Sequence, residues 1–247
     1  MSLSLFLQTL KASELDYTPS EITRQKVSGK ILTTLIAPTA VGKSTLINRV
    51  IELAGPDFSE SYSVVTRPRR PTDPAMYKTS DEGYTIERVG RMIEAQELTH
   101  YTVHPSGQIY GSLPDSFPAR YNLLPCVPSI LNIVQRVGFF AVYPIYIVTS
   151  VHDWAERLPE RRADPSYRAR LSEAIESLTW AIAHSDELLF VENISGQLDN
   201  AATIIKEVTR GRTITIDTAV HGTTLAKAML AYAKQELATT VSPNLVL

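Results

Sequence analysis

The chain has 247 residues, of which 44% are hydrophobic and 20% charged, a composition typical of a folded globular protein. Its formal net charge of −2 gives no broad basic field, and no apolar run is long enough to span a bilayer. We therefore expect neither a nucleic-acid nor a membrane partner. A single cysteine, Cys126, excludes an internal disulfide framework and is typical of a reducing compartment, which predicts a cytoplasmic protein.

The first part of the chain contains one clear strand and one clear helix. Residues 1–28 are mostly polar and are interpreted as an extension, amphipathic or flexible, rather than a signal peptide. Residues 30–36 are apolar and β-branched, which predicts a strand buried on both faces. A loop follows, and helical spacing then extends from Ser44 to Ala54, where Gly55 ends the helix.

Strands and helices alternate along the rest of the chain, after a segment at 59–84 with little periodicity. Further strands are predicted at 98–103, 121–127, 139–148, 187–193 and 212–217. Further helices are predicted at 86–98, 129–138, 151–184 (with a break near Ala163–Pro165), 197–211 and 223–237. This alternation predicts an α/β fold in which a parallel sheet carries helices on both faces.

The loop between the first strand and helix has the spacing of a phosphate-binding loop. Residues Ala37 to Ser44 read APTAVGKS, which matches G-x-x-x-x-G-K-[ST] except that alanine replaces the first glycine. In such loops backbone amides and the helix N-terminus bind phosphate oxygens. The nucleotide-binding residues expected here are Ala40, Val41, Gly42, Lys43, Ser44 and Thr45, with Lys43 reaching the β and γ phosphates and Ser44 a ligand of Mg²⁺. A chance match on an ordinary strand–helix connection is the alternative.

Later motifs resemble the guanylate kinase family over roughly residues 30–210. They are SYSVVTRPRRP, QIYGS, ERLPERR, YRARL and FVEN. The resemblance implies a P-loop core at 29–211, with a nucleoside-monophosphate-binding insert at about 59–117 and a helical lid at about 155–170, followed by a strand–helix extension at 212–247. It also implies ATP and Mg²⁺ as cofactors.

The resemblance assigns residues to an acceptor site. Ser63, Arg67 and Arg70 match an S-x-x-x-R-x-x-R segment, and two guanidinium groups at this spacing can hold a phosphate bidentately. The remaining acceptor residues are Tyr84 (with Tyr77 as second choice), Tyr110, Ser112 and His100. A solvated basic loop is the alternative for the arginines, and an ordinary strand end is the alternative for the tyrosine and serine of QIYGS.

Further matches concern the transferring phosphate and the adenine. Arg157, Arg161 and Arg170 match arginines of the lid and the helix after it, where cations stabilise the transferring group. Together with Lys43 and Arg67 they form the predicted catalytic set. Asn193 matches an adenine-facing asparagine. Surface ion pairs are the alternative for any one of these arginines.

Two departures from the family concern acceptor recognition. The family's guanine-reading glutamate corresponds to His100, and an imidazole cannot accept two parallel N–H donors as a carboxylate does. Two aspartates of a D-x-D segment correspond to Pro125 and Val127. The sequence predicts an ATP-dependent nucleoside monophosphate kinase for GMP or dGMP, monomeric or dimeric. Ribose 1,5-bisphosphate phosphokinase, another nucleoside monophosphate kinase and a non-catalytic phosphopeptide-binding module remain as alternatives.

Overall fold

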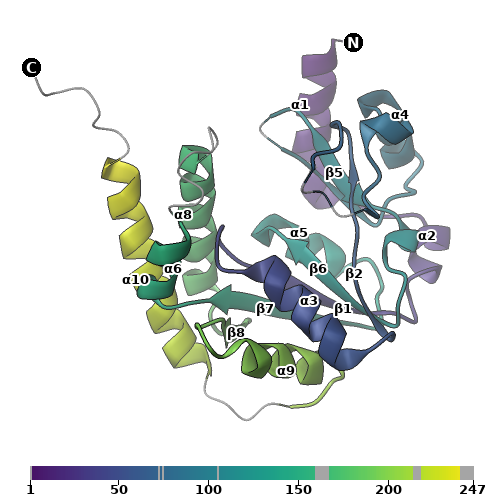
Figure 1. Ribbon diagram of the computed structural model, residues 1–247. Coiled ribbons are helices and arrows are strands. Elements are labelled where there is room, and N and C mark those ends of the chain that lie inside the picture. The colour runs from purple at the N-terminus through teal and green to yellow at the C-terminus, as the bar shows by residue number, and fades with distance from the viewer. Residues whose placement is uncertain are drawn as a thin grey trace, which may run out of the picture. The chain divides into compact units, whose positions relative to one another are not determined.

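The computed structural model describes residues 2–71, 73, 75–104, 106–158, 167–213 and 218–239, the last segment without the side chains of 218 and 219. Within these ranges a five-stranded sheet has the order β2-β6-β1-β7-β8, and a three-stranded sheet has the order β3-β5-β4 (Figure 1). In the larger sheet β2 pairs with β6, and β7 with β8, in parallel; both pairings of the smaller sheet are antiparallel. The predicted fold class, an α/β protein with a parallel sheet flanked by helices, is confirmed.

The strands are short and the helices longer. The strands are β1 (Ile31–Ile36), β2 (Phe58–Glu60), β3 (Val64–Val65), β4 (His100–Val103), β5 (Ile109–Ser112), β6 (Tyr121–Cys126), β7 (Ala141–Val148) and β8 (Leu189–Glu192). The helices are α1 (Leu3–Ser13), α2 (Glu21–Gln25), α3 (Lys43–Ala54), α4 (Ile86–Glu94), α5 (Pro128–Val134), α6 (Val151–Arg157), α8 (Tyr167–Ala183), α9 (Leu198–Thr209) and α10 (Thr218–Thr239).

Contacts between residues divide the chain into two compact units. The first unit contains Met1–Leu32, Pro56–Leu124 and Ser129–Val142, and the second contains Thr33–Gly55, Pro125–Pro128 and Tyr143–Leu247. The residues before position 29 belong to the first unit, and α10 belongs to the second.

In the first unit the N-terminal segment packs on the three-stranded sheet. Leu10 of α1 is buried in a cluster with Val89 and Ile93 of α4 and Tyr101 of β4. Glu14, only 4% exposed, accepts hydrogen bonds from the Val103 amide at 3.0 Å and the Thr102 hydroxyl at 3.2 Å. A buried carboxylate is tolerated only with such partners. The amphipathic character of the segment therefore serves packing within this unit.

Strand β1 begins in the first unit with Ile31 and Leu32 and continues into the second unit, where α3 packs against α9. All six residues of β1 are buried, as expected for a strand covered on both faces. Leu46, Ile47 and Val50 form the buried face of α3, which packs against α9 (Figure 1). Gly55, with φ +82°, closes α3 in a backbone conformation that favours glycine.

The C-terminal helix α10 packs against α8, α6 and β8 (Figure 1). Ala226, Met229 and Ala233 are fully buried and recur at helical spacing along one face. A Cβ added to Gly222 would lie 2.2 Å from Cβ of Phe190, so only glycine permits this approach of α10 to β8. Among the described helices none is long and apolar enough to cross a membrane.

Several elements differ from their sequence predictions. α4 ends at Glu94, short of residue 98, because Gln96 takes φ +55° and its carbonyl accepts hydrogen bonds from Ser20 and Thr23 instead of a helical partner. Strands β2 and β3 lie in the segment that showed no periodicity, since two or three residues are too few for a pattern. Of the strand predicted at 212–217, residues 212 and 213 lie in no strand, and the others lie outside the described residues.

Candidate functional site

The candidate phosphate-binding loop connects β1 to α3 in the second unit. Gly42 is the N-cap of α3 with φ +86°, and Ala40 takes φ +63°, so the chain makes a left-handed turn before the helix begins. Ala37 is not among the residues with positive φ, which explains why alanine can replace glycine there. The helix N-terminus, where amides have no intrahelical acceptor, therefore follows directly on a tight turn.

The loop is held by its carbonyl groups. The Trp154 indole donates to the Thr39 carbonyl at 2.8 Å, the Asn193 side-chain amide donates to the Val41 carbonyl at 2.7 Å, and Arg157 donates to that same Val41 carbonyl at 3.1 Å. These contacts all engage carbonyl oxygens, so none of them uses an N–H donor of the loop. Within the described residues, the amides of Val41, Gly42 and Ser44 donate no backbone hydrogen bond outside the regular elements.

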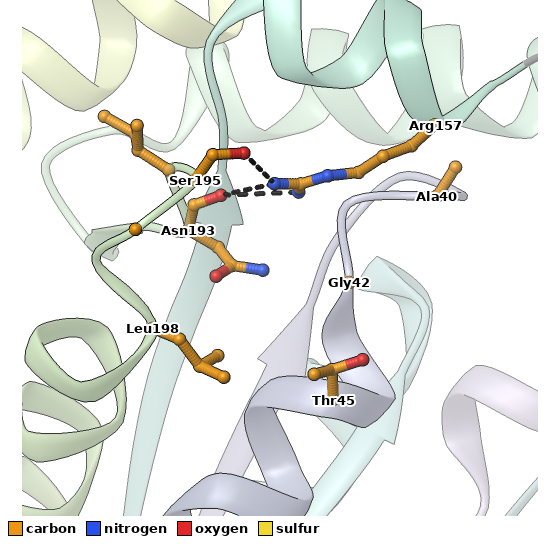
Figure 2. A pocket seen from close by; sticks show the side chains of 9 residues that line it. Ala40, Gly42, Thr45, Arg157, Asn193, Ser195 and Leu198 are labelled. Atoms are coloured by element: carbon orange, nitrogen blue, oxygen red, sulfur yellow. Dashed lines mark hydrogen bonds between the residues drawn. The ribbon is translucent and has the colours of Figure 1, made fainter.

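A cavity of about 380 Å³ opens beside this loop. Figure 2 shows Gly42 and Thr45 on one side and Asn193, Ser195 and Leu198 on the other, with the Arg157 side chain reaching across. The remaining lining residues are Ala40, Ile194 and Gly196. A cavity at a helix N-terminus, with apolar and polar walls, has the properties of a small-molecule site.

A hydrogen-bond network positions Asn193 at the end of β8. The Thr149 hydroxyl donates to the Asn193 carbonyl at 2.9 Å, and Arg157 donates to the same carbonyl at 3.4 Å and to the Ser195 hydroxyl at 3.4 Å. Asp153 accepts from the Ser195 amide at 3.1 Å, and its hydrogen bonds to Ser195 hold the pKa of its carboxyl below its ordinary value. Asn193 thus lies in a fixed position, 5% exposed, between the loop and the cavity.

Residues that could hold ATP and Mg²⁺ lie at the start of α3. Lys43 is its first residue, and its charge acts on the Cys126 thiol at the end of β6, whose pKa burial raises to about 12. Exposed Ser44 is the metal ligand predicted from the sequence. Within the described part of the chain no group of three or more His, Cys, Asp or Glu side chains could hold a metal ion. Mg²⁺ tolerates such a site when waters and phosphates complete its shell.

The predicted lid arginines fall in different places. Arg157 ends α6 and lines the cavity, and it donates hydrogen bonds to the carbonyls of Val41 and Asn193 and to the Ser195 hydroxyl. Arg170 lies in the first turn of α8, half-buried. Arg161 lies outside the described residues. Of the predicted catalytic arginines, the structure therefore brings Arg157 to the candidate phosphate-binding loop.

In the first unit, Arg67, which follows β3, lies against Tyr110 of the central strand β5. Arg67 Nε donates to the Tyr110 hydroxyl at 3.1 Å, and its two Nη atoms donate to both carboxylate oxygens of Asp73 at 2.6 and 2.8 Å. Arg70 is exposed, and its amide donates to Asp73 at 2.7 Å. The basic segment is therefore organised around Asp73, which the sequence did not single out.

His100 and Ser112 face each other across β4 and β5 and are both buried. Burial lowers the pKa of His100 to about 4, so its imidazole is neutral at pH 7. The Ser112 hydroxyl is fully buried and donates to the Tyr62 carbonyl at 3.2 Å. A Cβ on neighbouring Gly111 would lie 2.8 Å from the His100 carbonyl, which is why this strand pair requires glycine.

The two candidate tyrosines differ in their neighbours. Tyr77 is hydrogen-bonded to Ser63, and burial raises the pKa of its hydroxyl. Tyr84 lies beneath the guanidinium of Arg88, 4.2 Å from Arg88 Cζ to the ring centroid, and packs against the core that α1 completes. The structure therefore joins Ser63 to Tyr77, the second choice, and not to Tyr84.

Sequence reasoning missed four residues of these sites: Trp154, Asp153, Ser195 and Asp73. The contacts of Trp154, Asp153 and Ser195 join positions far apart in the chain, as in the bond from Trp154 to Thr39, whereas Asp73 lies six residues from Arg67. One signal was available, because Ser150 caps α6 and helical spacing from that cap places Asp153 and Trp154 in its first turn. Asp73 gave no signal beyond its proximity to three arginines.

Of the three comparisons with known proteins, only the search of solved structures finds similar chains. No protein-family model matches the sequence, and a search of curated proteins finds no match. Among solved structures the chain is similar to guanylate kinase from Anaplasma phagocytophilum, with 17% identity and a TM-score of 0.46 over 74% of this chain and 85% of that one. A similarity at this level concerns the fold and does not bear on activity or substrate.

Proposed function

We propose that the chain is an ATP-dependent phosphotransferase that acts on a nucleoside monophosphate, in the first place GMP or dGMP. The observation that carries this proposal is the loop at Gly42. Its carbonyls are bonded to Trp154, Asn193 and Arg157, and its amides lie at a helix N-terminus beside a cavity. That arrangement suits the phosphates of a nucleotide, with its base in the cavity.

Each group of the loop has a proposed role. The amides of residues 40–45 and the Lys43 ammonium bind the phosphate oxygens, and the Ser44 hydroxyl ligates Mg²⁺. When bound, Mg²⁺ neutralises phosphate charge. Arg157 is a positioning residue, since its contacts to Val41 and Asn193 orient the loop and the cavity wall. Catalysis by such a site rests on positioning and charge neutralisation, without a covalent intermediate.

A second candidate acceptor is favoured by the burial of Ser112 and His100. The Ser112 hydroxyl is 0% exposed and already donates to a carbonyl, and His100 is 6% exposed and neutral. These groups offer a guanine ring little to bind in this arrangement. A phosphorylated sugar such as ribose 1,5-bisphosphate has no base to recognise and is therefore the second candidate.

The test is an assay of ATP-dependent phosphorylation with a panel of acceptors. The panel contains GMP, dGMP, AMP, UMP, dTMP and ribose 1,5-bisphosphate. Transfer to GMP or dGMP above the others supports the first candidate, and transfer to the sugar alone supports the second. A protein that binds a phosphorylated peptide but transfers phosphate to no acceptor contradicts both and favours a binding module.

A further inference from the structure

Most N–H donors of the Arg67 guanidinium group already form hydrogen bonds within the chain. Besides Tyr110 and the two oxygens of Asp73, it donates from Nη1 to the Pro68 carbonyl at 3.0 Å. Four of the five N–H donors that a guanidinium offers are thus engaged. The side chains of Arg67 and Asp73 are only 10% and 7% exposed, so solvent does little to weaken the pair.

Asp73 presents the geometry that an acceptor phosphate would need. Its two oxygens accept from two different nitrogens of Arg67, which is the bidentate arrangement shared by carboxylates and phosphates. The hydrogen bonds from Arg67 lower the pKa of the Asp73 carboxyl, so it remains ionised at neutral pH. A ligand phosphate can engage both nitrogens of this fork only by taking the place of Asp73.

We propose that Asp73 is an internal competitor for the acceptor phosphate on Arg67, and that it selects phosphate groups by their charge. This inference rests on the proposed function in taking Arg67 as the acceptor's phosphate-binding residue. A singly charged phosphodiester gains nothing by replacing a singly charged carboxylate. A doubly charged phosphomonoester gains the attraction of its second charge in a site shielded from water. The acceptor is therefore a phosphomonoester.

The position of Asp73 permits the exchange. It closes a turn in which its amide donates to the Arg70 carbonyl at 3.0 Å, and Arg70 and Pro71 of that turn are exposed. The neighbouring pair of Arg69 and Glu82 differs, because Glu82 also caps a helical turn through the Thr79 amide at 2.7 Å. Glu82 therefore provides a matched control.

The experiment compares wild type, Asp73→Asn and Glu82→Gln by calorimetric titration with three ligands. GMP and inorganic phosphate provide doubly charged phosphate at mildly alkaline pH, and 3′,5′-cyclic GMP provides a singly charged diester with the same base. We expect Asp73→Asn to bind GMP or inorganic phosphate about tenfold more tightly than wild type, because the Arg67 guanidinium no longer pairs with a carboxylate. Cyclic GMP should gain affinity by a similar factor in the same variant, because the competitor is removed for both ligands, and Glu82→Gln should behave like wild type.

The proposal is overturned if folded Asp73→Asn binds phosphate as tightly as wild type or more weakly, because Asp73 would then orient Arg67 instead of competing for it. It is also overturned if none of the proteins binds phosphate. Should that variant fail to fold, two measurements remain. First, wild type must bind GMP more tightly than cyclic GMP. Second, Tyr110→Phe, in which Arg67 stays paired with Asp73, must show no gain in affinity for GMP. The opposite of either result overturns the inference. Tighter phosphate binding by Asp73→Asn without transfer to any acceptor would contradict the proposed function alone.

Discussion

The side-chain amide of Asn193 donates to the main-chain carbonyl of Val41 at 2.7 Å, so the end of β8 fixes the turn that precedes α3. Asn193 is itself held by Thr149 and Arg157 through its carbonyl. This relationship makes the loop a supported structure and not a free connection. The shape of the proposed phosphate site therefore depends on residues that need not touch the nucleotide.

Replacing Asn193 with alanine should weaken ATP binding about five- to tenfold, because the Val41 carbonyl loses a hydrogen bond worth roughly 1 kcal/mol. Calorimetric titration measures the effect. Exposed Asn200 in α9 provides the control, and Asn200→Ala should bind ATP like wild type. Equal affinity of the two variants would show that Asn193 does not support the site.

Trp154→Phe should lower ATP affinity by a similar factor. The substitution keeps an aromatic ring near Tyr232, 6.0 Å away between centroids, but removes the donor that binds the Thr39 carbonyl. The chain's other tryptophan, Trp180, stacks on His184 in α8 and serves as the control. Nucleotide binding should also change the fluorescence of Trp180→Phe, in which Trp154 alone emits. No change there would contradict the contact.

Gly42→Ala should abolish ATP binding, with a loss of affinity of at least about a hundredfold, roughly 3 kcal/mol. Gly55→Ala is a closely matched control, since the two glycines flank α3 with φ of +86° and +82° and share the strain of a left-handed alanine, about 1 kcal/mol. Only at position 42 does the new Cβ meet a neighbour, Asn193 Nδ2 at 2.7 Å. Equal losses in both variants would mean that backbone strain alone accounts for them.

His100 should make folding stability depend on pH. Its pKa is lowered by burial from an ordinary 6.5 to about 4 in the folded chain. Below pH 6.5 the unfolded chain therefore takes up a proton that the folded chain does not. The contribution of neutral His100 to the free energy of unfolding is fully present above pH 6.5 and is lost as pH falls through 4. About 2 kcal/mol of it is lost between pH 7 and 5.

Urea unfolding of His100→Gln at these two pH values tests this expectation. The variant should lose about 2 kcal/mol less stability than wild type over the interval. His152, whose side chain is 81% exposed, is the control, and His152→Gln should follow wild type. If the free energy of unfolding changes with pH as much in His100→Gln as in wild type, the result contradicts the burial of a neutral imidazole.

The sequence predicts those elements whose patterns are long or strongly apolar. β1 and α3 lie within a residue or two of their predicted bounds, because a buried apolar run and a helical repeat ending at Gly55 are local signals. β2 and β3 could not be predicted, since their short runs pair with partners distant in the chain, as Phe58 does with Tyr121.

The candidate site was predicted only where residue type and spacing carry the chemistry. The loop around Gly42 follows from its motif, but its support by Trp154 does not, because that bond spans 115 positions along the chain. Likewise the sequence gives Arg67 as a phosphate-binding residue but does not reveal that Asp73 already holds it. The Trp154 contact arises from tertiary structure, and the six-residue separation of Arg67 and Asp73 does not by itself decide which groups pair.

The most direct test of the central claim, that this loop binds the phosphates of ATP, is the ATP dissociation constant of Lys43→Ala beside wild type and Lys227→Ala. Lys227 is exposed on α10, so its loss controls for the removal of one positive charge. We expect Lys43→Ala to bind ATP about ten- to a hundredfold more weakly than wild type, because a charge-assisted contact is lost. Lys227→Ala should bind ATP as tightly as wild type. Equal ATP affinity in all three proteins, with Lys43→Ala still folded, would contradict it.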